Sequence, residues 1–281
     1  MKCAGVVGLH GVPVTTRLAA RRRWTYDRPP MRFTAIRLVV LMLALLAGCA
    51  TVPLPEAPST TVARFSTNSD RSELPQEWQP WIINRTKTPT EYRLVRDPQT
   101  GVVVLHAHAD AAASGLRQLL DVDPAQQPIV AWRWRVLDLI VSADNQDRYA
   151  EDSPVRLMLF FDGDKKALPF KEQVLMDTAK LLTGQDLPYA TLMYIWENRF
   201  PVGTILPNSF TSQVKLLVAG SGADQRLGKW KQFERNYVDD YRKAFGTSPG
   251  RLIGVGIMTD TDNTGATVDA WYGDIRFVPA P

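Results

Sequence analysis

Short segments typical of β-strands, separated by turn sequences, constrain the fold of this 281-residue chain more than any other feature. Turn sequences such as Asp97-Pro98, Asp162-Gly163-Asp164 and Ser221-Gly222 punctuate them. The eight segments cover residues 92–96, 102–106, 129–136, 155–161, 191–197, 213–218, 252–259 and 267–277. Because they do not alternate regularly with helices, a parallel βαβ sheet is disfavoured. The sequence predicts a mainly β fold, an antiparallel β-sandwich of the jelly-roll kind.

Two helices are expected at the periphery of this sandwich. Asn236 can cap the second helix and Gly246 can end it. Its apolar stripe consists of Tyr237, Tyr241, Ala244 and Phe245. The first helix, around residues 170–182, ends near Gly184 and has a similar stripe of Phe170, Val174, Thr178 and Leu181. Helical stripes of this kind usually pack against a core, so we expect the stripe of the second helix to dock on the sandwich.

The sequence Leu46-Ala47-Gly48-Cys49 closes an apolar run over residues 38–46 that follows Met31-Arg32 and Arg37. A positive segment, a short apolar run and small residues define a secretory signal, and nine apolar residues are too few to span a bilayer. A cysteine at the first mature position resembles bacterial lipoproteins, in which that residue is acylated, with palmitate among the expected groups. Because a signal should begin near the start codon, the pattern favours translation from Met31.

The chain therefore divides into three expected parts. Residues 1–48 are a leader and lipoprotein signal peptide, residues 49–61 a proline-containing tether, and residues 62–281 a single β-sandwich domain. Lipidation of Cys49 would anchor the protein in the bacterial cell envelope. Ala50 at the second mature position resembles signals for the outer membrane, with the domain facing the periplasm.

The net charge of +4 comes from the leader. Residues 1–48 hold eight of the 33 Lys and Arg and one of the 29 Asp and Glu, which leaves 25 basic and 28 acidic residues in 49–281. A mildly acidic mature chain without a basic run argues against nucleic-acid binding. Cys3 and Cys49 are the two cysteines, so the mature domain must be stable without a disulfide.

Several motifs give the chain a family resemblance. The most specific are Tyr194-Ile195-Trp196, Arg235-Asn236 followed by Asp240-Tyr241, Thr259 to Gly265, and Trp271-Tyr272-Gly273-Asp274-Ile275. Upstream, Trp132 to Val136 and Glu151 to Arg156 add to them. The chain resembles bacterial exported proteins known as domain of unknown function 3047, and more loosely galactose-binding-like jelly rolls. The first resemblance implies no catalytic residues, and the second is one of architecture only.

Alternating residues in the strand over 129–136 place Trp132, Trp134 and Val136 on one face and Arg133 and Arg135 on the other. The aromatic face is expected in the core. The arginine face is either part of a structural ion-pair network or a site for an anionic or polar ligand. Asp152 and Arg156 are further candidates for that network or ligand site. If they form one ligand site together with Glu197, these five residues should converge on one concavity.

Glu197 ends the strand over 191–197 beside Trp196, where it could form the rim of a sugar-binding pocket or simply cap a turn. Its use in a glycosidase would require a second carboxylate at a defined separation. The sequence leaves four aspartates open as that partner: Asp152, Asp260, Asp269 and Asp274.

Asp260, Asp262 and Asn263 gather oxygen ligands in one short loop, a chemistry that calcium prefers. The comparison with an EF-hand fails, because Trp271 stands where a bidentate glutamate is needed. A turn explains the same residues, because Asp, Asn and Gly satisfy loop amides. Calcium is the one cofactor that the sequence suggests, with an ordinary turn as the alternative.

Recognition is favoured over turnover, because the sequence contains no nucleophile elbow, no phosphate loop and no free mature cysteine that could act as a nucleophile. We expect an envelope lipoprotein whose sandwich binds a glycan or another envelope component. The alternatives are a polysaccharide hydrolase that uses Glu197 and an aspartate, and a structural partner in an envelope protein complex.

Overall fold

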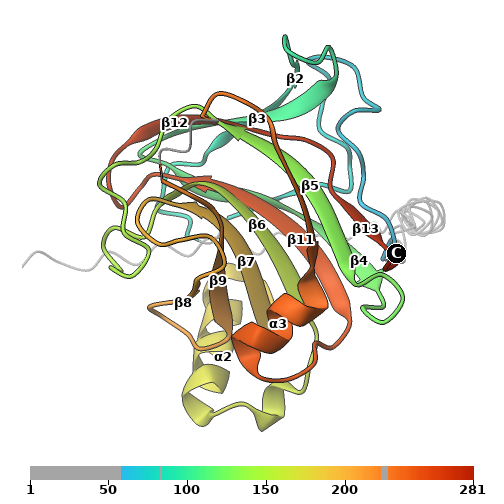
Figure 1. Cartoon of the computed structure of the whole chain (residues 1–281). Coiled ribbons are helices and arrows are strands. Elements are labelled where there is room, and N and C mark those ends of the chain that lie inside the picture. Colours follow the sequence, from blue (N-terminus) through green and yellow to red (C-terminus); the bar gives the residue numbers. More distant parts are fainter. Residues whose placement is uncertain (1–57, 83, 223–226) are drawn as a thin grey trace, which may run out of the picture. The chain divides into compact units, whose positions relative to one another are not determined.

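Two β-sheets face each other in the computed structural model, which describes residues 58–82, 84–222 and 227–281 (Figure 1). Within those residues the larger sheet has seven strands, of which β7 and β9 run parallel and all other neighbours antiparallel. In spatial order they are β1 (Gln79–Trp81), β4 (Ala113–Val122), β11 (Leu252–Asp260), β6 (Ser153–Phe161), β7 (Ala190–Glu197), β9 (Val214–Ser221) and β8 (Ile205–Pro207). The expected antiparallel-rich β-sandwich is confirmed.

The second sheet of the described chain has six strands, all paired antiparallel. It runs in the order β10 (Lys231–Asn236), β5 (Ile129–Val136), β12 (Thr267–Tyr272), β3 (Val103–Asp110) and β2 (Glu91–Arg96), with β13 (Arg276–Val278) also paired to β5. The single strand predicted over 267–277 is therefore two strands. They separate at Gly273, where a Cβ atom would lie 2.5 Å from the Arg133 side chain.

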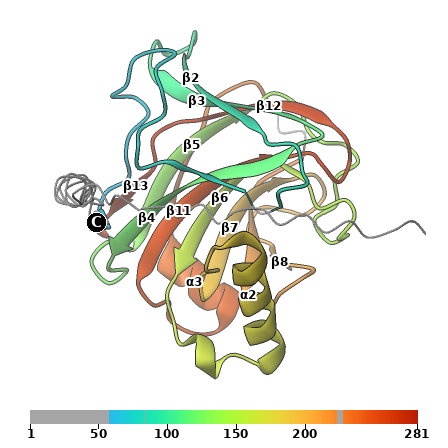
Figure 2. The same ribbon diagram turned by 180° about the vertical axis from the view of Figure 1, so that it is seen from behind.

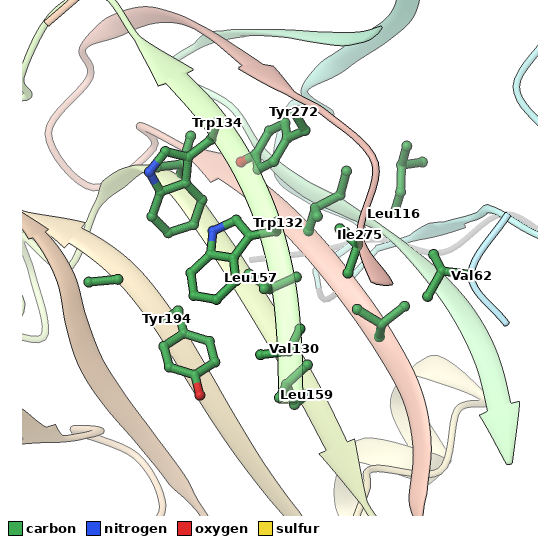
Figure 3. Close-up of a cluster of buried hydrophobic side chains, with 14 of the residues drawn as sticks. Val62, Leu116, Val130, Trp132, Trp134, Leu157, Leu159, Tyr194, Tyr272 and Ile275 are labelled. Carbon is green, nitrogen blue, oxygen red and sulfur yellow. The ribbon is translucent and has the colours of Figure 1, made fainter. Parts of the chain in front are cut away.

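The core lies between the sheets, and the alternation of strand residues fills it. Figure 3 shows Trp132 and Trp134 of β5 pointing toward Leu157 and Tyr194 of the facing sheet. The Trp132 ring packs 4.9 Å from the Tyr194 ring, measured between centroids. The prediction that the tryptophans of β5 face the core is confirmed. Each such buried side chain contributes about 1.5–3 kcal/mol to stability.

Helix α3 (Tyr237–Phe245) closes one end of the sandwich as the sequence predicts (Figure 1). The Asn236 side chain accepts hydrogen bonds from the Val238 and Asp239 amides, and Gly246 ends the helix in the left-handed conformation. Tyr241 packs against Phe161 of β6, with ring centroids 4.7 Å apart. The apolar stripe therefore docks on the core.

Helix α2 (Phe170–Thr183) follows a short 3₁₀ helix, η1 (Lys165–Ala167), and lies over the outer face of the seven-stranded sheet (Figure 2). Phe170 and Leu181 are 80% and 84% exposed, whereas Met176 and Glu172 are buried. Glu172 holds this orientation because its carboxylate accepts hydrogen bonds from the Thr211 hydroxyl and from the Ser212 amide and hydroxyl. The apolar stripe of this helix therefore faces away from the sandwich.

The described residues belong to one compact unit that spans residues 57–281. The leader, Cys49 and most of the tether lie outside the described residues, so those predictions stay as the sequence leaves them. Among the described helices, none combines the length and the apolar character needed to cross a bilayer.

Candidate functional site

A cleft of about 390 Å³ lies between α2 and the outer face of the seven-stranded sheet. Met193 of β7 and Met258 of β11 point away from the core and line the sheet side of the cleft, while α2 contributes Leu175 and Met176. Trp81 of β1 lines it as well. Methionines and an indole ring form a surface that adapts to apolar ligand atoms.

The end of the cleft near the start of β6 is polar. Arg156 points outward from β6, because its neighbours Val155 and Leu157 point into the core. Its Nε donates to Asp260 Oδ1 at 2.9 Å, and its Nη2 donates to the Glu151 carbonyl at 2.8 Å. Its Nη1 donates to the Met193 sulfur at 3.3 Å, a weak acceptor. The Nε and Nη2 atoms thus have strong acceptors. Nη1 has only a weak one and can still donate to a stronger acceptor.

The Glu151 carboxyl group lines the same polar end and is nearly buried, with 10% of its side chain exposed. Its Oε1 accepts a hydrogen bond from Asn208 Nδ2 at 3.0 Å and lies 3.8 Å from Arg156 Nη1. Its Oε2 is buried without a hydrogen-bond partner among the described residues. Burial raises the pKa of the Glu151 carboxyl, and Arg156 offsets only part of that effect. An unsatisfied buried acceptor of this kind is costly. Glu197 Oε1 is a second such atom, but only the Glu151 carboxyl lies in the wall of the cleft, where a ligand can reach it.

Three carboxylates, of Asp152, Asp260 and Asp262, gather beside this end, each offering one oxygen within 4.8 Å of the others. Asp152 accepts hydrogen bonds from the amides of Asn263 and Thr264 and from the Thr264 hydroxyl. The three aspartates come from the loop before β6 and from the end of β11 and the loop that follows it. The register of β6 with β11 brings them together, because Ser153 pairs with Asp260.

Their oxygen chemistry suits calcium, but protein cations already pair with two of the three groups. Lys87 forms an ion pair with Asp262, and Arg156 with Asp260. The Asn263 side-chain amide donates to the Arg148 carbonyl, and its backbone amide donates to Asp152. A calcium ion would therefore compete with Lys87 and Arg156. Binding of calcium at Asp260, Asp262 and Asn263 stays a prediction.

Arg133 and Arg135 lie far from this cleft in the fold, on the outer face of the six-stranded sheet. Arg135 is buried, forms a 2.8 Å ion pair with Asp97 and packs 4.1 Å from the centre of the Trp271 ring. Arg133 packs on the Trp230 ring at 4.6 Å. His106 lies 4.8 Å from Trp271 between ring centroids. The arginines thus belong to a stack of rings and cations that braces this sheet.

Glu197 caps a turn at the end of β7. Its Oε2 accepts hydrogen bonds from the Arg199 and Phe200 amides at 2.5 and 2.6 Å. Its side chain is buried and does not line the cleft. Backbone amides that converge on a carboxylate in this way stabilise a loop.

The five ligand-site candidates therefore do not converge on one concavity. Only Asp152 and Arg156 lie together, with Asp260 and Asp262 beside them, while Arg133, Arg135 and Glu197 lie elsewhere. Sequence reasoning missed Glu151, Lys87, Asn208 and Trp81. Of these four residues, only Glu151 could have been selected from the sequence, because it precedes Asp152 within the family-like motif Glu151 to Arg156.

Comparison with solved structures finds distant likenesses. The K2 cleaved adhesin domain of Lys-gingipain (Kgp) is 11% identical with a TM-score of 0.35, and the match covers 78% of this chain and 98% of that one. Cellulose induced protein Cip1 is 14% identical with a TM-score of 0.32, covering 78% and 95%. A β-1,2-glucanase from Parabacteroides distasonis is 11% identical with a TM-score of 0.31, covering 73% of this chain and 23% of that one. Likenesses this distant do not indicate what this chain binds.

No match was found among curated proteins. The family comparison is more specific, because one family model matches residues 76–276, which include all of the cleft residues named above. That model is described as a protein of unknown function, DUF3047. The chain belongs to the DUF3047 family.

Proposed function

We propose that this protein is a ligand-binding module of the cell envelope and that it binds a hydroxyl-rich ligand, a glycan, in the cleft beneath α2. The observation that carries the proposal is the pairing of Arg156 and Glu151 at the polar end. Arg156 Nη1 is a donor with a weak acceptor, and Glu151 Oε2 is an acceptor with no hydrogen-bond partner in the described part of the chain.

The chemistry of this pair distinguishes between ligand classes. A hydroxyl group can accept a hydrogen bond from the guanidinium and donate one to the carboxylate at the same time. A ligand carboxylate that pairs with Arg156 would also lie beside the Glu151 carboxylate. A ligand ammonium group that pairs with Glu151 would also lie beside Arg156. Each would therefore meet a like charge. The methionines and Trp81 offer apolar surface to the C–H face of a sugar ring. A cleft with few convergent polar groups on apolar walls is typical of small-ligand sites.

Retention of residues 50–281 on a glycan array and on purified cell wall tests this proposal. We expect Glu151→Gln and Arg156→Gln to reduce retention at least about tenfold, since each removes a charged hydrogen-bonding partner worth about 1.5–3 kcal/mol. Glu197→Gln is the matched control, because it alters a second buried carboxyl outside the cleft. Retention of the wild-type chain on neither surface, or equal loss in all three variants, would contradict the proposal.

The envelope location is also a proposal, and it rests on the sequence around Cys49. Acylation there would tether the domain to the outer membrane, facing the periplasm. Metabolic labelling with a palmitate analogue should mark the wild-type chain and leave a Cys49→Ser variant unlabelled. If the variant remains equally membrane-associated and labelled, the anchor is not at this cysteine.

Hydrolysis of the bound glycan is a second candidate function, with Glu151 in the place that the sequence suggested for Glu197. Burial keeps the pKa of Glu151 raised, as a general acid requires. Glu151 would protonate the glycosidic oxygen while Asp260 or Asp262 takes a proton from the attacking water, giving two sugar products. Release of reducing ends that Glu151→Gln abolishes and Glu197→Gln preserves would favour catalysis over binding alone.

A further inference from the structure

The outward face of α2 carries large apolar side chains that no described residue covers. Phe170, Leu181 and Leu182 are 80%, 84% and 73% exposed, and Val174 is 45% exposed. The helix cannot turn this stripe inward without releasing Glu172 from Thr211 and Ser212. Contiguous apolar patches on folded proteins are uncommon and mark interaction or membrane surfaces.

The points at which the chain enters and leaves the sheet indicate which surface this patch faces. β4, β11 and β6 have one end in common, because Leu252 pairs with both Val122 and Phe161. The segment that carries α2 leaves the sheet after Phe161 and returns to it at Ala190, which is the same end. Ser59 also joins the sheet there, because its carbonyl accepts a hydrogen bond from the Asp121 amide.

A chain anchored at Cys49 would therefore hold this end of the sheet near the membrane. The ten residue-to-residue steps from Cys49 to Ser59 can span at most about 35 Å. We infer that the stripe of Phe170, Val174, Leu181 and Leu182 rests on the lipid surface and holds the α2 side of the cleft next to the membrane. This inference uses the proposed anchor at Cys49 for its geometry, but it can be tested without that anchor.

The charges around α2 predict which lipids matter. Between residues 162 and 189 the lysines are Lys165, Lys166, Lys171 and Lys180, and the acidic residues are Asp162, Asp164, Glu172, Asp177 and Asp186. Lys180 is paired with Asp186 at 3.0 Å. Because this segment has no excess of positive charge, attraction to anionic headgroups should be small. Contact should instead come from burial of the apolar side chains, and depend little on lipid charge or salt.

Vesicle flotation with residues 50–281 tests the inference, because the compact unit 57–281 contains the described core in full. Vesicles of phosphatidylethanolamine and phosphatidylcholine, with and without anionic phosphatidylglycerol, are the probes. We expect similar binding to both compositions. Phe170→Ser combined with Leu181→Ser should weaken it at least about tenfold, because two large side chains lose their burial in lipid.

Val141→Ser combined with Val202→Ser is the matched control. Val141 and Val202 are 86% and 55% exposed and lie in the loops before β6 and after β7, at the opposite end of the sheet. This control should bind vesicles like the wild type. Cell-wall retention of all variants reports on the cleft separately, so failure of one proposal does not imply failure of the other.

Three results would overturn the inference. The first is no flotation of the wild-type chain, and the second is equal flotation of the Phe170 and Leu181 variant. The third is a dimer in sedimentation analysis that the same two substitutions dissociate, because a second copy of the chain would then cover the stripe.

Discussion

Glu151 and Glu197 lie at the same end of the seven-stranded sheet and are both largely shielded from solvent, yet their environments differ. Glu197 Oε2 accepts two backbone amides that hold a turn. Glu151 has one amide partner, the Asn208 side chain. Each carboxylate has a second oxygen without a hydrogen-bond partner in the described residues, but only Glu151 lines the cleft. The difference arises from loops that a sequence pattern cannot place. This is why the sequence selected Glu197 and missed Glu151.

Replacing Glu151 by Gln should stabilise the protein at neutral pH. The pKa of Glu151 is raised by burial, so protonation favours the folded state. That contribution is full below the unfolded pKa of about 4.3 and is lost as pH rises through the folded pKa. At pH 7 the ionised Glu151 carboxylate therefore lowers the free energy of unfolding of the wild type, and the neutral Gln side chain removes this loss. Melting temperatures should show a gain for Glu151→Gln at pH 7 that shrinks toward pH 4.

A lower melting temperature for Glu151→Gln at both pH values would show instead that the carboxylate is favourably paired with Arg156. The melting temperature of Glu197→Gln provides the comparison. This substitution should lower it at pH 7, because the Glu197 carboxylate holds a turn through two backbone amides. A residue that lowers stability while facing a cleft is typical of functional sites.

Lys87 controls the response to calcium in this arrangement. Lys87→Ala removes the ammonium group beside Asp262 and leaves the three aspartates less neutralised. Thermal melts with millimolar calcium and with a chelator should show a larger calcium-dependent rise for the variant than for the wild type. If neither protein responds, the aspartates serve only the ion pairs and the turn. If both respond equally, Lys87 does not compete with the ion.

Among the elements, α3 is fixed by contacts that also explain part of the family motif. Arg235 donates from Nε and Nη2 to the two oxygens of Asp240 at 2.6 and 2.7 Å. The hydroxyl of Tyr194 on β7 donates to the same carboxylate at 2.9 Å. Asp240 is buried, so the helix is joined to β10 and to the larger sheet through one charged group.

Asp240→Ala should lower the free energy of unfolding by about 3 kcal/mol, because it leaves a partly buried guanidinium and a buried hydroxyl unpaired. Tyr194→Phe removes only the hydroxyl and should cost about 1 kcal/mol. Denaturant unfolding of both variants measures the difference. Similar losses for both would show that the Arg235 ion pair adds little to stability.

Local sequence predicts α3 well and α2 only in part. The capping residues and the apolar stripe predict α3 correctly, because Asn236 and Gly246 form their hydrogen bonds with residues close to them in the sequence. The stripe of α2 faces solvent, because Glu172 bonds to residues about forty positions away in the chain. β4 was missed altogether. Its Gly115, Arg117, Gln118 and Leu119 have no strong strand preference, and its pairing with β1 and β11 decides its structure.

In the whole molecule, the regions that stabilise the fold lie apart from the candidate site. The core lies between the sheets, the six-stranded sheet has a braced outer face, and the cleft occupies the outer face of the other sheet. The sequence predicts the sandwich because strand alternation is local. It does not predict the cleft, because Glu151, Arg156 and Asp260 meet only through the register of β6 with β11.

Methionine methyl signals test the central claim, that the cleft beneath α2 is the ligand site. Residues 50–281 contain four methionines, of which Met176, Met193 and Met258 line the cleft and Met158 does not. Titration of methyl-labelled protein with a glycan retained in the binding assay should shift the signals of Met176, Met193 and Met258 and leave Met158 nearly unchanged. Shifts confined to the indole signals of Trp230 and Trp271 would place the ligand on the opposite sheet and contradict the account.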